Sequence, residues 1–90
     1  MVIVVKRRGK KEGFDEKKVY ASIYSACKDC NLEVKECESI AARITNDVKL
    51  FIKDRGQVNS TELFGFVIQK LAKTHEPVAF MYSTHREFLG

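Results

Sequence analysis

The chain has 90 residues, of which 44% are hydrophobic and 31% charged, a composition typical of a soluble globular protein and sufficient for one domain over residues 1–90. Its net charge of +4 and pI near 9.1 favour an anionic partner, such as a nucleotide, a nucleic acid or an acidic surface. The chain has no long uncharged apolar run and no signal-peptide core near its start, so we expect a cytoplasmic protein without a membrane partner.

The first residues predict a β-hairpin. Val2–Val5 has the β-branched composition of a strand, Gly9 marks a turn, and Lys10–Phe14 would return as the second strand. An isolated hairpin is only marginally stable in water, so this one needs a surface on which to lie. Asp15 follows as a good N-cap for the first helix.

Two long amphipathic helices are expected next. The first spans Asp15–Cys30, Asn31 breaks the helical pattern, and the second spans about Leu32–Arg55. Gly56 suits the position just after the end of that second helix. The second helix carries a sustained apolar stripe made of Val34, Cys37, Ile40, Ala41, Ile44, Val48, Phe51 and Ile52.

The remaining chain predicts a short strand and two further helices. Gln57–Val58 is an extended link that suits a third strand, and Asn59–Glu62 matches a helix capping box. The third helix would turn inward Leu63, Phe64, Val67, Ile68, Leu71 and Ala72. After a break at Thr74–Glu76, Pro77 fits the first turn of a fourth helix. Its apolar side would comprise Val78, Met81, Tyr82, His85 and Leu89.

This order of elements predicts an α+β fold. An N-terminal β-hairpin, or a small three-stranded sheet, would lie on a four-helix bundle.

Cationic side chains gather around the start of the first helix. Lys17 and Lys18 lie in its first turn, where a positive charge is disfavoured by the helix dipole. The adjoining hairpin adds Lys6, Arg7, Arg8, Lys10 and Lys11. Cations beside the free N–H groups of a helix suit an anion, and phosphate fits the Lys and Arg donors best. A solvated basic turn without a ligand is the alternative.

Other polar residues give weaker signals. Glu12 is the only acid in the hairpin, and it could pair with Lys10 or Lys11 or accept hydrogen bonds from a ligand base. No arrangement of a nucleophile, a base and an acid stands out, and no phosphate-binding glycine loop is present. We therefore expect no catalytic residues and no enzymatic activity.

The three cysteines are Cys27, Cys30 and Cys37, an odd number that argues against a set of structural disulfides. The Cys27-x-x-Cys30 pair suggests a metal or thiol module, but a zinc site needs four ligands and no nearby histidine or second pair completes this one. We expect packed thiols and no metal site, with the metal or thiol module as an alternative.

The stretch VVKRRGKKEGFDEKKV closely resembles the start of the ATP-cone family. The matching elements are Val4-Val5, Lys6-Arg7-Arg8-Gly9, Phe14-Asp15 and Lys18-Val19. The resemblance continues at Val58 to Leu63 and from His75 to Tyr82, and so covers nearly the whole chain.

The resemblance implies a regulatory function. ATP cones bind ATP or dATP under a small β-sheet lid on a four-helix bundle. Their function is to bind the nucleotide and not to hydrolyse it. They usually lie at the N-terminus of ribonucleotide reductase large subunits, where nucleotide occupancy changes the oligomeric state and so the activity. They also follow a zinc ribbon in a repressor of reductase genes. The implied ligand here is ATP or dATP, with Mg²⁺ as an accompanying ion.

Site residues are implied by position. Lys6, Arg7 and Lys18 would contact the phosphates, and Arg86 would add a late phosphate contact from the fourth helix.

Four further positions would surround the rest of the nucleotide. Val4 would border the base, Glu12 would read the adenine edge with Asp15 nearby, and Ser60 matches a small hydroxyl position at the start of the third helix.

This sequence departs from the family pattern in three ways. Arg8 stands where Asp is frequent, and Phe64 stands where some nucleotide-inhibited reductases carry a polar residue. The sequence contains neither a reductase barrel nor a zinc ribbon, so we expect a free-standing cone that acts through a protein partner or homo-oligomer. The alternative is a small nucleic-acid-binding protein or transcriptional regulator that uses the basic hairpin.

Overall fold

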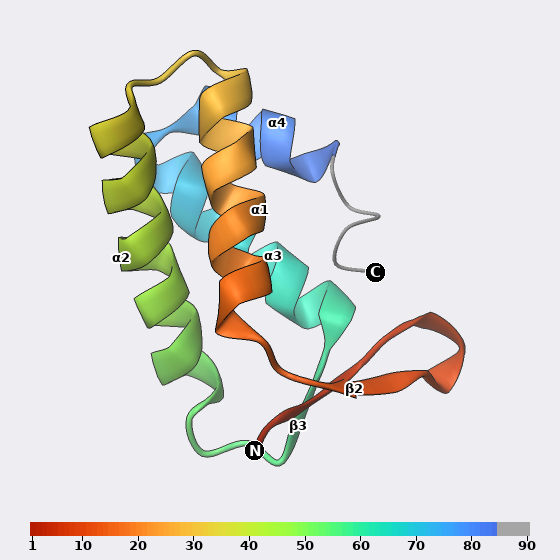
Figure 1. The fold of residues 1–90 in the computed structure, drawn as a ribbon. Helices are drawn as coiled ribbons and strands as arrows, with labels where there is room; N and C mark the ends of the chain where they lie inside the picture. Colours follow the sequence, from red (N-terminus) through yellow and green to blue (C-terminus); the bar gives the residue numbers. More distant parts are fainter. Residues whose placement is uncertain (85–90) are drawn as a thin grey trace.

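The computed structural model describes residues 1–84 and confirms the α+β class (Figure 1). A three-stranded sheet lies at one end of four helices. The strands are β1 (Ile3–Val5), β2 (Lys11–Gly13) and β3 (Gln57–Asn59). The helices are α1 (Glu16–Asp29), α2 (Val34–Ile52), α3 (Ser60–Thr74) and α4 (Glu76–Ser83).

The sheet has the order β2-β1-β3, so β1 is central. β1 pairs antiparallel with β2, which places Val4 opposite Glu12, and parallel with β3, which places Val4 opposite Val58. The third strand expected at Gln57–Val58 is therefore confirmed. It joins the N-terminal hairpin to the start of α3.

The hairpin turn forms a 3-10 segment at Arg7–Gly9. The φ angles of Arg8 and Gly9 are 64° and 77°, in the left-handed region. Glycine adopts this conformation freely, whereas a residue with a Cβ pays about 1 kcal/mol or more. The turn projects away from the helices, so its basic side chains are presented to solvent (Figure 1).

Asp15 caps α1 as the sequence predicts. Its Oδ1 accepts a hydrogen bond of 3.0 Å from the backbone N–H of Lys17. At the other end, Asn31 adopts a left-handed φ of 62°, and the N–H of Leu32 donates to the Cys27 carbonyl at 3.2 Å. The break expected at Asn31 is confirmed.

Replacing Asp15 with alanine is expected to lower the free energy of unfolding by about 1 kcal/mol, because an N–H group of the first turn loses its acceptor. Asp15→Ser, which keeps a capping oxygen, should retain most of the stability. Urea denaturation of both variants measures this difference. Equal loss in both would contradict the capping role.

The predicted bounds of the second helix were too wide. α2 begins at Val34, because the N–H of Leu32 closes the end of α1. It ends at Ile52, and Gly56 lies beyond it in the link to β3 rather than directly after the helix. The carbonyl of Gly56 accepts the N–H of Ile3 at 3.0 Å, so sheet pairing draws this segment away from the helix.

The capping box predicted at Asn59–Glu62 is wrong. Asn59 occupies the N-cap position of α3, but its side chain accepts no hydrogen bond from the first turn of the helix. The Glu62 carboxylate instead binds the Arg55 guanidinium at 2.7 Å. By contrast, Pro77 lies in the first turn of α4 as expected. His85 and Leu89, which were expected on α4, lie outside the described residues.

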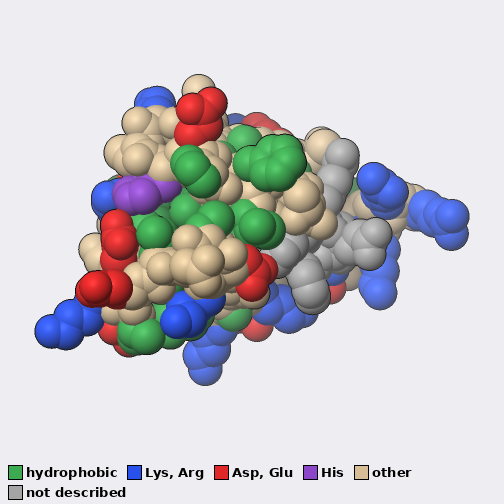
Figure 2. All heavy atoms as spheres, turned by 90° about the horizontal axis from the view of Figure 1, so that it is seen from above, with side chains coloured by type: hydrophobic (Ala, Val, Ile, Leu, Met, Phe, Trp, Pro, Cys, Tyr) green, Lys and Arg blue, Asp and Glu red, His purple; other side chains and the backbone are tan. Residues whose placement is uncertain are grey.

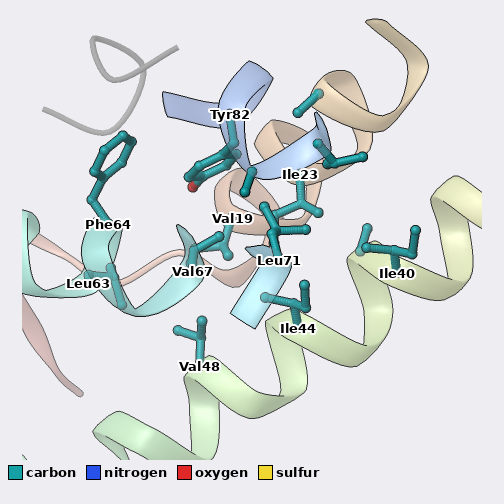
Figure 3. Packing of buried hydrophobic residues seen from close by; sticks show 14 of the residues in the cluster. Val19, Ile23, Ile40, Ile44, Val48, Leu63, Phe64, Val67, Leu71 and Tyr82 are labelled. Atoms are coloured by element: carbon teal, nitrogen blue, oxygen red, sulfur yellow. The ribbon is translucent and has the colours of Figure 1, made fainter. Parts of the chain in front are cut away.

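The four helices and the sheet share one hydrophobic core. Figure 3 shows side chains from α1, α2, α3 and α4 meeting there. Val34 and Ala72 were predicted to face inward, but both are exposed. Each lies near a helix end, where no neighbouring element covers it. Tyr82 is buried and stacks on Phe64 with ring centroids 5.4 Å apart.

Two hydroxyl groups connect α1 to α4 within this core. Ser22 and Tyr82 lie 3.2 Å apart through their side-chain oxygens. Burial raises the pKa of Tyr82 to about 12. The phenol therefore stays neutral at physiological pH and acts as a packed structural group.

The thiols pack among the helices as expected. Cys27 and Cys37 are buried, and the Cys30 thiol donates to the Pro77 carbonyl at 3.5 Å. Burial raises the pKa of Cys27 to about 12, which leaves it a poor nucleophile. Within residues 1–84, no cluster of His, Cys, Asp and Glu has the geometry to hold a metal ion. In the same range, no helix is long and apolar enough to cross a membrane.

Candidate nucleotide-binding site

Five of the eight predicted site residues surround one small pocket. It lies between the sheet and the starts of α1 and α3, and its volume is about 30 Å³. The five residues are Val4, Glu12, Asp15, Lys18 and Ser60. We refer to it as the sheet pocket.

The sheet register explains why these residues meet. Val4 and Glu12 are directly opposite each other on β1 and β2, so their side chains share one face of the sheet. Ser60 follows β3 at once as the first residue of α3. Asp15 and Lys18 enter from the first turn of α1, which begins three residues after β2. Short connections therefore bring β1, β2 and the starts of α1 and α3 to one point.

Glu12 holds two of the predicted phosphate ligands together. Its Oε1 lies 2.9 Å from Nζ of Lys6 and 3.8 Å from Nζ of Lys18. The sequence suggested Lys10 or Lys11 as ion-pair partners for Glu12, but neither binds it. Lys11 alternates to the opposite face of β2, since neighbouring strand residues point in opposite directions.

The two lysines change the acidity of this carboxyl group. The hydrogen bond from Lys6 lowers the pKa of Glu12, and the charges of Lys6, Lys18 and Lys10 lower it further. Glu12 is therefore ionised at neutral pH, and the group of Lys6, Lys18 and Glu12 keeps one net positive charge. An incoming phosphate could take over the two ammonium groups, because charge-assisted bonds to phosphate are strong. Glu12 would then be free to accept hydrogen bonds from another part of the ligand.

The pH dependence of stability tests this ion-pair group. Because the folded-state pKa of Glu12 lies below its ordinary value of 4.5, the group stabilises the fold above about pH 4.5. This contribution is lost as the pH falls through the lowered pKa. We expect the difference in unfolding free energy between wild type and Glu12→Gln to stay constant near neutrality and shrink in acid. A difference independent of pH down to acid would contradict the pairing.

The size of the sheet pocket limits what it admits in this conformation. Sites for small ligands usually measure about 300 to 1,000 Å³, whereas the sheet pocket measures about 30 Å³. In this conformation the sheet pocket is therefore much smaller than a nucleotide, which would fill it only with part of its structure. β2 is an edge strand that pairs with β1 alone.

Two of the predicted phosphate ligands within residues 1–84, Lys6 and Arg7, do not line the sheet pocket. Arg7 lies exposed in the hairpin turn, and Arg86 lies outside the described residues. Lys6 reaches the site through Glu12. Sequence reasoning missed the apolar lining formed by Phe14, Val19 and Leu63. These residues are apolar in the sequence, but their helical spacing predicted core positions for Val19 and Leu63. Phe14 was used only in the match to the family motif.

The hairpin turn forms a second basic surface. Arg7, Arg8, Lys10 and Lys11 are all exposed. Figure 2, seen from above, shows Lys and Arg side chains gathered at the end to which the hairpin projects in Figure 1. We refer to these four residues as the basic tip, and none of them lines the sheet pocket.

Comparisons with known proteins show the family of the chain. The family model described as the ATP cone domain matches residues 2–89. Transcriptional repressor NrdR of Trichodesmium erythraeum (strain IMS101) is 31% identical over 90 residues, covering 99% of this chain and 50% of that protein. Transcriptional repressor NrdR of Kosmotoga olearia (strain ATCC BAA-1733 / DSM 21960 / TBF 19.5.1) is 30% identical over 89 residues, covering 97% and 54%.

The chain spans about half the length of these curated relatives. A repressor is a regulator rather than a catalyst, in agreement with the expectation that this chain is not an enzyme. The match over residues 2–89 is nearly as long as the chain itself, and the resemblance seen in the N-terminal motif is thereby confirmed. The chain belongs to the ATP-cone family.

Proposed function

We propose that this chain binds ATP or dATP at the sheet pocket and acts as a regulatory module. The observation that carries the proposal is the convergence of Lys6 and Lys18 on Glu12 beside a pocket between the sheet and two helix starts. The two lysines would bind phosphate, with Arg7 approaching from the turn. Glu12 would accept hydrogen bonds from the adenine edge, and Val4 would border the base.

Regulation follows from the size of the pocket. The sheet pocket is smaller than a nucleotide, and we propose that a bound nucleotide displaces β1 and β2 from the starts of α1 and α3. A partner protein or a second copy that contacts the sheet would then sense occupancy, since a ligand shifts the equilibrium toward the state it binds better. Mg²⁺ would accompany the nucleotide phosphates, and we place the protein in the cytoplasm as one domain.

Isothermal titration with ATP, dATP and GTP tests the proposal. We expect saturable binding of ATP or dATP below millimolar concentration, and weaker binding of GTP, whose base edge presents a carbonyl where adenine presents an amino group. Binding no tighter than millimolar for both adenine nucleotides would sink the proposal. Equal affinity for GTP would mean that the site binds the phosphates only and that Glu12 does not recognise the adenine edge.

A second candidate function is nucleic-acid binding through the basic tip. Four exposed cations on a projecting turn favour it, and relatives of this chain are transcriptional repressors by name. A gel-shift titration against salt tests it. Such binding should weaken steeply as salt rises, and substituting Arg7, Arg8, Lys10 and Lys11 together should flatten that dependence. Affinity that is insensitive to both changes would exclude this candidate.

A further inference from the structure

A larger pocket shares Phe14 with the sheet pocket. It is an open surface hollow lined by the residue before β1, the start of α1 and the end of α2, and its volume is about 390 Å³. Figure 1 shows the N-terminus, the start of α1 and the end of α2 at the same end of the bundle. We call it the α1–α2 pocket. Its volume lies within the usual range of small-ligand sites, about 300 to 1,000 Å³.

The floor of this pocket is apolar and well anchored. It is formed by Val2, Phe14 and Ile52. Ile52 is a buried core residue, and the other two pack against the core. The Phe14 N–H donates to the Val2 carbonyl at 2.9 Å, which holds these two residues together. A flat apolar group lying here would remove hydrocarbon surface from water.

The rim of the pocket is cationic. It carries Lys17, Lys49 and Lys53. Lys49 binds the Glu16 carboxylate at 3.0 Å, whereas Lys17 and Lys53 form no ion pair with any residue of 1–84. The acids at the rim are engaged, since Glu16 pairs with Lys49 and Asp15 accepts the N–H of Lys17. Two cations therefore remain available beside an apolar floor.

We propose that the α1–α2 pocket binds a small organic anion with a flat apolar body. The body would lie on Phe14, and its phosphate, sulfonate or carboxylate would lie between Lys17 and Lys53. Inorganic phosphate engages only the rim and a neutral aromatic only the floor, so each alone binds more weakly. Such a combination of apolar walls and a few placed polar groups is typical of small-molecule sites.

This site is linked to the sheet pocket by shared walls. Phe14 and Asp15 line both pockets, and Val2 continues directly into β1. Movement of the sheet would therefore change the shape of the α1–α2 pocket. An anion bound there would shift the affinity of the sheet pocket for its own ligand, and the coupling is reciprocal.

Titration of the isotope-labelled full chain with naphthyl phosphate, followed by amide chemical shifts, tests the proposal. We expect saturable changes at Val2, Lys17 and Lys53. The double variant Lys17→Gln/Lys53→Gln should bind about tenfold more weakly, because charge-assisted bonds are lost. Inorganic phosphate and naphthol carry the two halves of the probe separately. Each should bind the wild-type chain no more tightly than the double variant binds naphthyl phosphate.

Lys28→Gln/Lys35→Gln is the matched control, since it removes the same charge from exposed positions at the opposite ends of α1 and α2. It should leave naphthyl phosphate binding unchanged. Equal weakening in both double variants, or no saturation below millimolar probe, would overturn the proposal. So would changes centred on Glu12 and Ser60, which would place the probe in the sheet pocket. None of these outcomes depends on whether ATP binds.

Discussion

Replacing Lys6 and Lys18 together with alanine is expected to weaken ATP binding by about a hundredfold. Each ammonium group would lose a charge-assisted bond to phosphate, worth about 1.5 to 3 kcal/mol, and the exposed Lys18 lies at the low end of that range. Both substitutions also leave the Glu12 carboxylate without its cations, so a negative charge would face the incoming phosphates. Isothermal titration measures the loss directly.

The matched control for this pair is Lys10→Ala/Lys11→Ala. It removes the same charge from the hairpin at two exposed positions that do not line the sheet pocket. We expect a loss of affinity below about fivefold, from weaker long-range attraction alone. Equal losses in the two double variants would show that the nucleotide senses only the overall charge of the hairpin. Circular dichroism of each variant checks that the fold is kept.

Leu71→Ala is expected to lower the free energy of unfolding by about 2 to 5 kcal/mol. Leu71 is 0% exposed in α3, so truncation leaves a cavity as well as losing hydrophobic burial. A domain of this size has a total stability of about 5 to 13 kcal/mol, so the variant should be close to unfolding at physiological temperature. Urea denaturation measures the change.

Leu50→Ala provides the matched control for the core. Leu50 lies on α2 with 63% of its surface exposed, so the same truncation leaves no cavity and should change stability by less than about 0.5 kcal/mol. A loss for Leu71→Ala as small as that for Leu50→Ala would mean that α3 is not packed in the core as described. A loss for Leu50 alone would point to an interface that covers α2.

Features set by local chemistry could be predicted from the sequence. The cap at Asp15 depends only on one side chain and an N–H two residues away, so the N-cap pattern was sufficient. The helices were visible because apolar residues recur at helical spacing, and Pro77 fixed the start of α4. The third strand was recognisable as a short extended link between two helices.

Features set by distant partners could not be predicted. The Asn59–Glu62 pattern looked like a capping box, but the Glu62 carboxylate binds Arg55 across the preceding link instead. Gly56 looked like a helix end until pairing with Ile3 placed it beside the sheet. In both cases a tertiary contact outweighed a local preference of about 1 kcal/mol or less.

The candidate site was predictable in its charges and not in its shape. Misplaced cations in the first turn of α1 pointed to an anion, and Lys18 does lie at the sheet pocket. The pairing of Lys6 with Glu12 depends on the hairpin register, which spacing alone leaves open. The small volume of the pocket depends on how closely the sheet approaches α1 and α3, which no sequence pattern specifies.

The central claim is that an adenine nucleotide binds between the sheet and the starts of α1 and α3. Its most direct test is the titration of the isotope-labelled chain with ATP, followed by amide chemical shifts. We predict saturable changes that centre on Val4, Glu12, Lys18 and Ser60 and extend along β1 and β2 as the sheet moves. Changes confined to the Arg7–Gly9 turn, or changes that do not saturate up to millimolar ATP, would contradict it.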